Sequence, residues 1–352
     1  MDFNFSMPGP SFPSLSSSFP SSSSSPLTFK ADTLLGGGLR GEAWKFNELR
    51  DGRVVGSFVV KYAKSPFSMA TIEKEIRILQ RLQGHRHIAQ LVLDLGQLRA
   101  IPPAAHAISI PERTTVYLVT EYVRNGTLSR FLQAARSKGG PIPNRVLWLI
   151  FLCLVRIALA LARPTHPPPA VPPRPSLEQP PLFEPATGTH YQVYHGDLRN
   201  LLNLMFGDLS PPAGAGSEPE HALLPILKAI DFGEAEDEYG RFAEECLSPP
   251  VTAPTLTSAN IRDVGIVMSM CLSLSLSTPR AVYLSQHPAL DPDIYDLVVS
   301  CAHDDAGQRP TLANLYAAVM RKVSAAGDGN GKESEARVRR WLREVLFEGD
   351  TR

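Results

Sequence analysis

Apolar and polar residues recur along the chain with two different periods. Residues 71–83 place their apolar side chains three and four positions apart, the spacing of one face of an α-helix. Residues 57–62 and 116–123 are short apolar runs typical of strands, and Asp51-Gly52 ahead of the first run is a hairpin signal. The amino-terminal part is therefore predicted to hold a small sheet and a helix.

The carboxy-terminal part has a different pattern, which is mainly helical after residue 220. Strands that come first and helices that follow predict an α+β protein with two unequal lobes. Residues 146–162 are the most apolar stretch, but they number only 17 and include Arg156, whereas a membrane-spanning helix needs about 20 residues. We expect a buried helix here and no transmembrane segment.

The last periodic stretch, residues 333–347, predicts an amphipathic helix. Its apolar residues share one face and its arginines share the other. Such a helix could contact a membrane or a partner, or it could pack on the helical lobe. The sequence leaves both alternatives open.

Three segments have neither period. Residues 1–28 are rich in Ser and Pro, and we expect them to be a disordered tail. Residues 164–188 hold ten Pro in 25 positions and residues 208–220 are small and polar, so both are expected to be insertions. The Pro-rich insertion suits a partner that reads PxxP, although a solvated loop is the simpler expectation. Residues 327–352 form a linker and the amphipathic helix, and about 260 residues remain for one domain.

Composition and charge narrow the choice of partner and compartment. The chain has 352 residues, with 35 basic and 35 acidic side chains, so nothing favours a nucleic-acid partner. Its four Cys form no CxxC pair, which indicates reduced thiols in a cytoplasmic protein. The amino terminus lacks the basic and apolar regions of a signal peptide.

The first chemical motif is a glycine-rich stretch, GGGLRG, at residues 36–41. Glycines let a turn approach a phosphate closely and leave backbone N–H groups free to donate. The motif is weak alone, because a plain glycine turn has the same composition. A dinucleotide site would need a helix directly after it, whereas residues 42–46 look like a strand.

Charged residues in unexpected places give a stronger signal. Lys61 lies inside an apolar strand, where packing does not require it, and Glu75 lies on the helix that follows. A lysine on a strand paired with a glutamate on a helix can hold the phosphates of ATP. Further along, Asp197, Asn203 and Asp231 supply a proton acceptor and hard oxygen ligands, which suits Mg²⁺-assisted phosphoryl transfer.

In this order the motifs resemble those of the eukaryotic protein kinase family. The chain reads GGGLRG, FVVK, KEIRIL, VTEYV, HGDLRNLLN, IDFG and QRPT, from about Leu34 to Val323. The hinge and the QRPT segment look like those of tyrosine-kinase-like members. The resemblance implies a bilobal fold, with an N-lobe of about residues 29–123 carrying a small antiparallel sheet and the αC helix. A larger, mainly helical C-lobe of about 124–326 would follow. It also implies ATP, Mg²⁺ and a protein substrate.

The resemblance also assigns roles to matching positions. For catalysis, Lys61 would hold the α- and β-phosphates, Glu75 would orient Lys61, Asp197 would steer the substrate hydroxyl and Arg199 would lie near the γ-phosphate. For metal binding, Asn203 and Asp231 would be the Mg²⁺ ligands. For the nucleotide, the implied positions are Gly36, Gly38, Gly41, Ala43, Val59, Thr120, Glu121, Val123 and Met205.

The chain departs from the family pattern at several positions. Asn203 follows Asp197 by six residues instead of five, and Gly196 replaces the family's arginine before the catalytic aspartate. The end of the activation segment reads Ser248-Pro249-Pro250, which lacks the glutamate that would pair with Arg309. Either Asn260 or Asp263 occupies the position of the aspartate that anchors the catalytic loop.

Three functions follow from this pattern. The first is an active protein kinase that transfers the γ-phosphoryl group of ATP to a protein hydroxyl. The second is a pseudokinase, a nucleotide-binding or scaffold module, which the departures favour. The third is a small-molecule phosphotransferase of the aminoglycoside or choline kinase type, in which His-Gly-Asp also occurs.

Overall fold

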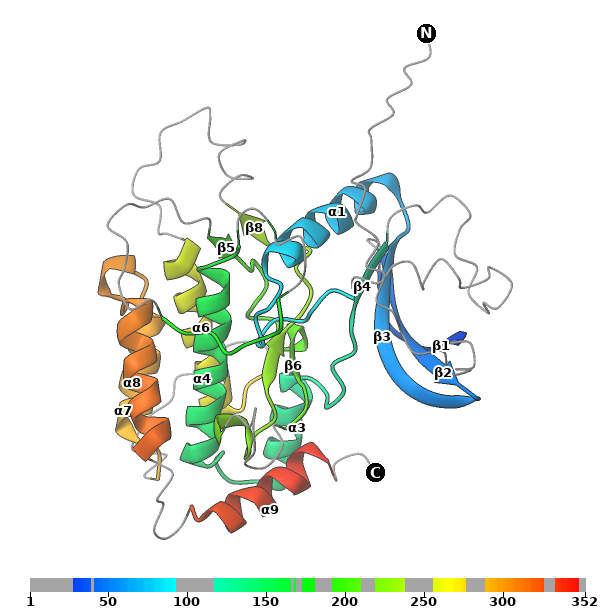
Figure 1. Cartoon of the computed structure of the whole chain (residues 1–352). Coiled ribbons are helices and arrows are strands. Elements are labelled where there is room, and N and C mark those ends of the chain that lie inside the picture. Colours follow the sequence, from blue (N-terminus) through cyan, green and yellow to red (C-terminus); the bar gives the residue numbers. More distant parts are fainter. Residues whose placement is uncertain are drawn as a thin grey trace, which may run out of the picture.

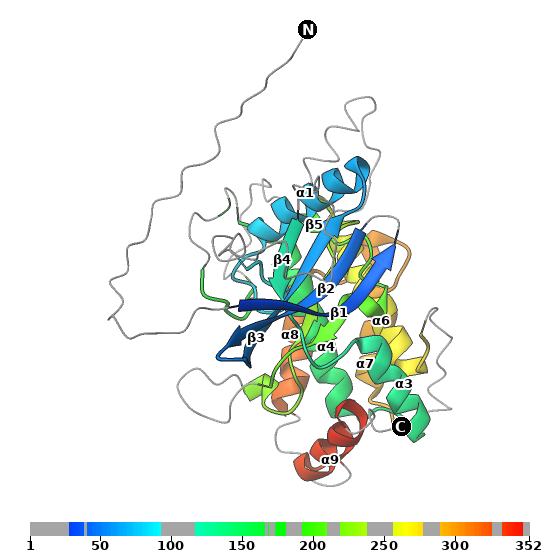
Figure 2. The same ribbon diagram turned by 90° about the vertical axis from the view of Figure 1, so that its right-hand side faces the viewer.

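The computed structural model is a mixed α/β protein of the α+β class (Figure 1). It describes residues 28–38, 41–92, 117–165, 168, 173–180, 192–209, 219–237, 256–276, 289–325 and 333–347. A small antiparallel sheet lies on one side and most of the helices lie on the other, as the perpendicular view also shows (Figure 2).

The sheet has four antiparallel strands in the order β1-β2-β3-β4. Their bounds are Thr28–Gly38, Gly41–Arg50, Arg53–Ala63 and Tyr117–Glu121. Asp51 and Gly52 join β2 to β3, both with positive φ, as expected of this hairpin turn. Both predicted strands are confirmed, and the one predicted at 57–62 extends over all of β3.

Helix α1, Pro66–Arg81, follows the sheet and lies along β3 and β4. The helix predicted at 71–83 is confirmed, but it begins earlier, because Ser65 and Ser68 form a reciprocal capping box and Pro66 occupies the first turn. Its buried face carries Ile72 and also Glu75.

Helix α4, Asn144–Leu161, runs through the centre of the helical part (Figure 1). In the described ranges it is the one helix that is long and apolar enough to cross a membrane, and it is largely buried between α6 and α8. The buried helix predicted at 146–162 is therefore confirmed. The other α-helices among the described residues are α3 Leu128–Lys138, α6 Leu256–Ser273, α7 Pro292–Cys301, α8 Leu312–Ala325 and α9 Glu335–Leu346.

Several short elements connect the longer ones. The bounds are β5 Val193–Tyr194, η2 Leu201–Asn203, β6 Leu204–Phe206, η3 Pro219–His221, β7 Leu227–Ala229, β8 Glu236–Asp237 and η5 Ala306–Gln308. Strand β5 pairs with β8, and β6 pairs with β7. These two ribbons bring HGD at residues 195–197 and IDFG at residues 230–233 together.

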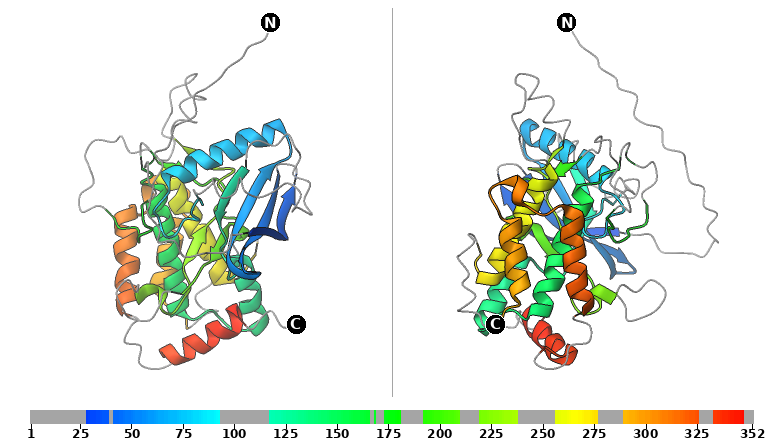
Figure 3. Two further views of the ribbon diagram at one scale, coloured as in Figure 1. Left: turned by 45° about the vertical axis from the view of Figure 1, so that its right-hand side comes forward. Right: turned by 90° about the vertical axis from the view of Figure 1, so that its left-hand side faces the viewer.

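The amphipathic helix predicted at the end of the chain is α9, and it packs on the protein. Its apolar residues Val338, Leu342 and Val345 are buried, and the Trp341 ring meets Phe131 of α3 edge-on at 5.8 Å. Figure 3 shows α9 at the end of the molecule opposite α1. Of the two alternatives, the structure therefore has the helix packed on its neighbours.

Of the expected solvated loop at 164–188, the described stretch 173–180 is irregular chain in which five residues are exposed, but it also makes specific contacts with the protein. The Ser176 N–H donates to the Gly84 carbonyl, the Ser176 carbonyl accepts from Arg86, and the Glu178 side chain is buried. Backbone pairing and a buried carboxylate attach residues 173–180 to the protein. The expected tail at 1–28 lies outside the described residues, except for Thr28, which begins β1. Residues 210–218 of the second expected insertion also lie outside the described residues.

Candidate functional site

One face of the sheet gathers several of the implied nucleotide-binding positions. Ala43 is the cross-strand partner of Lys61 and Val59 is the partner of Thr120, and side chains of such partners point to the same face. Gly36 lies opposite Ala43 in β1. The other face carries an apolar cluster of Phe46, Phe58, Val60, Tyr62 and Val119. The period of two therefore places Lys61 away from that cluster.

Lys61 joins the sheet to α1 and to the segment after β7. Its Nζ lies 2.8 Å from Glu75 Oε2 and 2.6 Å from Asp231 Oδ1. The other Glu75 oxygen accepts the Phe232 N–H at 3.0 Å. Three groups that the sequence separates by up to 170 positions are thus in direct contact.

The electrostatics of this cluster keep the lysine charged. Burial opposes protonation of Lys61, but the Glu75 and Asp231 carboxylates outweigh it and raise the lysine pKa. Burial acts against ionisation of Asp231, yet Lys61 and the Gly233 N–H hold the pKa of Asp231 below its ordinary value. For Glu75, burial outweighs Lys61 and raises the pKa. Asp231 is therefore the readier metal ligand of the two carboxylates.

Asp231 has a strained backbone. Its φ is 59°, in the left-handed region that non-glycine residues seldom adopt. Strain of this kind persists where the surroundings fix a conformation, and it gathers at functional sites. Here it directs the carboxylate toward Lys61 while Phe232 stays buried.

A second polar cluster surrounds Asp197. The Asn203 amide nitrogen donates to Asp197 Oδ2 at 2.8 Å and to the Asp197 carbonyl at 3.1 Å. Asn200 also donates to Asp197 Oδ2, at 3.1 Å, and caps η2. From the sequence, the strand pattern after Asn203 favours Asn203 over Asn200 as the metal ligand, and the structure brings both amides to Asp197.

Backbone contacts join the two clusters. The Ile230 N–H donates to the Asn203 carbonyl at 2.9 Å, so the residue before Asp231 lies beside Asn203. His195 Nε2 lies 3.2 Å from the Ile230 carbonyl, and the His195 ring packs at 4.7 Å from that of Phe232. These hydrogen bonds thus join the loop that carries Asp197 and Asn203 to the segment that carries Asp231.

The donor set fits a divalent cation of the Mg²⁺ kind. Both hydrogen bonds described for the Asn203 amide use its nitrogen, so its carbonyl oxygen is the atom left for a ligand. This oxygen and the carboxylates of Asp197 and Asp231 are hard donors of the kind that Mg²⁺ prefers, although Oδ1 of Asp231 is paired with Lys61 in this structure.

The backbone conformation explains why residue 196 is a glycine. Its φ is 78°, and a Cβ at this position would lie closer than 3.0 Å to the Glu234 carbonyl oxygen. No side chain fits there without a shift of the backbone. A glycine at this position is therefore a requirement of this loop.

The structure separates the roles of Asn260 and Asp263. Asn260 is buried, and its amide accepts from the His195 N–H at 3.2 Å and donates to the Val193 carbonyl at 2.7 Å. Asp263 accepts from Tyr194 at 3.1 Å and lies 3.3 Å from Arg199 Nε. Asn260 therefore holds the backbone of the HGD loop, and Asp263 pairs with Arg199.

The remaining implied positions make other contacts. Glu121 accepts from Lys228 at 2.5 Å and from the Gln90 N–H at 2.9 Å. Val123 is buried, and Met205 in β6 bridges to Thr127. Gly38 pairs with Gly41 where β1 meets β2, and the two residues between them lie outside the described residues.

Arg309 has partners without the missing glutamate. Its guanidinium donates to the carbonyls of Ser258, His303 and Asp304 at 2.7–3.0 Å. It therefore ties α6 to the loop after α7. The segment Ser248-Pro249-Pro250 lies outside the described residues.

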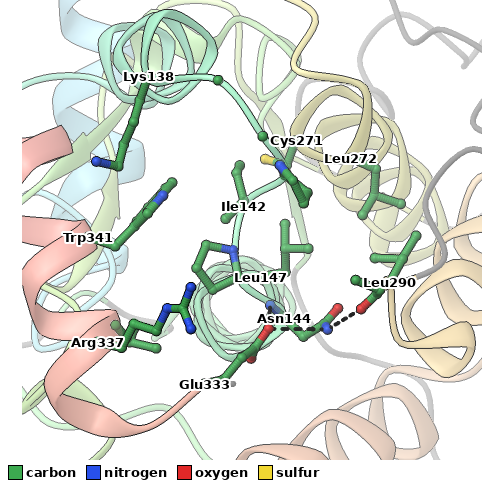
Figure 4. Close-up of a pocket in the computed structure, with 16 residues that line it drawn as sticks. Lys138, Ile142, Asn144, Leu147, Cys271, Leu272, Leu290, Glu333, Arg337 and Trp341 are labelled. Carbon is green, nitrogen blue, oxygen red and sulfur yellow. Dashed lines mark hydrogen bonds between the residues drawn. The ribbon is translucent and has the colours of Figure 1, made fainter. Parts of the chain in front are cut away.

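A separate pocket of about 410 Å³ lies in the helical part of the molecule, among α3, α4, α6 and α9 (Figure 4). Trp341 and Arg337 of α9 line it opposite Leu147 of α4 and Cys271 of α6. None of the residues in the Lys61 and Asp197 clusters lines it, so it is not the candidate site.

No family model matches the sequence, and no curated protein matches it.

Proposed function

We propose that the chain is an ATP-dependent protein kinase that transfers the γ-phosphoryl group to a protein hydroxyl. The observation that carries the proposal is the contact of Lys61 with both Glu75 and Asp231, next to the Asp197–Asn203 pair. A bilobal, kinase-like arrangement of the sheet with α1 and the helical part belongs to the same proposal. So do ATP and Mg²⁺ as cofactors and a cytoplasmic location.

The chemistry assigned to these residues is positioning and charge stabilisation. Lys61 would neutralise phosphate charge, and Glu75 would hold it there from a buried position. Asp197 would accept the proton of the attacking hydroxyl, held in place by Asn203 and Asn200. Asp231 and the Asn203 carbonyl oxygen would hold Mg²⁺, which would supply positive charge to stabilise the phosphoryl group during transfer.

The test compares Mg-ATP turnover of the full chain with Asp197→Asn and Asp231→Asn variants. Acceptors are mixed Ser, Thr and Tyr peptides and, separately, aminoglycosides and choline. We expect both variants to lose on the order of 10²-fold or more in peptide phosphorylation. Asp51→Asn is the matched control, because Asp51 is exposed, lies in the β2–β3 turn and has a positive φ that asparagine also adopts.

Equal background rates for the wild type and both variants would contradict the kinase proposal. Stabilisation of the fold by Mg-ATP without any turnover would instead support the pseudokinase alternative. Turnover with a small molecule and none with peptides would support the third function.

A further inference from the structure

A cluster of buried donor atoms lies outside the phosphotransfer site. It consists of His87 in the connection after α1, Cys153 in the middle of α4 and His221 at the end of η3. One nitrogen or sulfur atom from each lies within 4.8 Å of the other two. All three side chains are buried, at 0%, 1% and 2% exposure, so three distant segments bring metal-binding groups into one dry site.

Three of the four imidazole nitrogens in this cluster lack a hydrogen-bond partner among the described residues. Within the described residues, His87 Nε2 and both His221 ring nitrogens are buried without a hydrogen-bond partner. Buried polar atoms are nearly always paired, because leaving one unpaired costs free energy. Three unpaired nitrogens next to a thiol indicate a missing ligand that they share.

Glu178 orients one of the imidazoles. Its carboxylate oxygen Oε2 lies 2.6 Å from His87 Nδ1, and Oε1 accepts the His87 N–H at 2.9 Å. A carboxylate on one ring nitrogen is the usual support of a histidine that binds metal through the other nitrogen. The unpaired Nε2 of His87 is the nitrogen on the far side of the ring from that carboxylate.

Arg156 binds two of the segments that form the cluster. This buried side chain of α4 donates to the Glu178 carbonyl and, through Nη2, to both oxygens of Glu220 at 2.6 and 2.9 Å. Glu220 is the neighbour of His221 in the chain. One guanidinium therefore fixes both the segment that carries Glu178 and the turn that carries His221.

The ordinary alternative is a set of core histidines beside an inert thiol. That alternative accounts for one buried histidine paired with Glu178, but not for His221, both of whose nitrogens are unpaired within the described residues. A divalent cation bound to a Cys thiolate has one positive charge left, which the Glu178 carboxylate balances. Nitrogen and sulfur donors favour Zn²⁺ over Mg²⁺ or Ca²⁺.

We propose that His87, Cys153 and His221 bind a structural zinc ion, with Glu178 as the carboxylate that positions His87. From Zn–N and Zn–S bond lengths, ligand atoms around tetrahedral zinc lie about 3.3–3.6 Å apart, so the three donors need to approach by no more than about 1.5 Å. The described residues supply three ligands, and solvent takes the fourth position.

The location gives the ion a structural role. The His87 carbonyl accepts the Ala229 N–H at 2.8 Å, and the Ala89 N–H donates to the Ala229 carbonyl at 3.0 Å. Ala229 ends β7, two residues before Asp231. Zinc would fasten the connection after α1, the Pro-rich segment and η3 to α4, and would stiffen the strand that leads to Asp231.

The test measures zinc on the purified full chain after dialysis against a weak chelator. We expect about one zinc ion per chain for the wild type. Replacement by Co²⁺ should give the visible bands of tetrahedral cobalt and a thiolate-to-cobalt band in the near ultraviolet. Cys153→Ser should lose that band and bind zinc at least tenfold more weakly. Cys271→Ser is the matched control, because Cys271 is also a buried free thiol.

A wild-type chain that retains no zinc overturns the proposal, as does equal binding by the wild type and Cys153→Ser. Equal loss in the Cys271→Ser control also overturns it. If Cys153→Ser does not fold, X-ray absorption of the zinc-loaded wild type decides: one sulfur and two imidazoles around the metal support the site, and a coordination sphere without sulfur contradicts it. None of these readouts depends on phosphotransfer.

Discussion

At the scale of single residues, two backbone conformations decide where the chemistry of the candidate site can occur. Asp231 holds a left-handed φ of 59°, and Gly196 holds a φ of 78° beside the Glu234 carbonyl. The first directs a carboxylate to Lys61. The second lets the HGD loop pass close to the chain that follows Asp231, so that both acidic segments share one site.

Gly196→Ala should destabilise the protein by more than the strain of its φ alone. A positive φ costs an L-residue about 1–2 kcal/mol, and the close approach to Glu234 adds a clash that only a backbone shift relieves. We expect a total of about 3 kcal/mol, measured by urea unfolding. Gly52→Ala is the control, since Gly52 has a φ of 73° and no atom lies within 4 Å of the place that its Cβ would occupy. Equal losses of unfolding free energy in the two variants would contradict a clash at Gly196.

At the scale of elements, the β2–β3 hairpin is joined by side chains as well as by its backbone. Glu42 of β2 accepts from Tyr62 at 2.5 Å and from Trp44 at 2.9 Å, and it pairs with Lys64 at 2.5 Å. Tyr62 and Lys64 lie at and just after the end of β3, so these contacts join that end to β2 on the face opposite Lys61. The hairpin that carries the lysine is therefore sensitive to the charge of one carboxylate.

The stability of this hairpin should depend on pH, because it depends on the ionisation of Glu42. Lys64 first, and then Tyr62 and Trp44, lower the pKa of Glu42 from 4.5 to about 2. The folded protein thus binds this proton more weakly than the unfolded chain does, so the stabilisation is present above pH 4.5 and is lost as the pH falls toward 2. We expect Glu42→Gln to show a smaller fall in urea midpoint between about pH 5 and 3.5 than the wild type. Glu48→Gln, on the same strand, is the control, and the same fall in wild type and Glu42→Gln would refute the prediction.

At the scale of the whole molecule, α9 closes the end of the helical part. Its apolar side chains are buried, and Trp341 meets α3 through Phe131. A helix that could have bound a membrane is instead part of the core. Its arginines, such as Arg340, remain on the exposed side.

Leu342→Ala should therefore act as a core mutation. Leu342 is 3% exposed, and removal of a buried leucine side chain costs about 2–5 kcal/mol. Arg340→Ala should change the free energy of unfolding by no more than about 0.5 kcal/mol. Thermal or urea unfolding measures both, and a Leu342→Ala loss as small as that of Arg340→Ala would mean that α9 does not pack in solution.

The helices and strands were largely predictable because each has a recognisable local sequence pattern. The period of α1, the Asp51-Gly52 turn and the apolar run of α4 all express short-range physics. The candidate residues Lys61, Glu75, Asp197, Asn203 and Asp231 came instead from their residue types and from the resemblance of their order to that of the protein kinase family. The role of Asn260 against Asp263 was not predictable, because both lie within one helical turn and only the approach of the HGD loop distinguishes them.

By itself, the sequence determined the α+β class, the buried central helix and a candidate set of phosphotransfer residues, since periodicity and residue type are local properties. The tertiary structure alone decided which charges meet, such as Lys61 with Asp231 across 170 positions. It also decided that Gly196 must be a glycine, that residues 173–180 pack on the protein, and that His87, Cys153 and His221 converge. Contacts of this kind depend on the path of the backbone through space, and no spacing along the chain records that path.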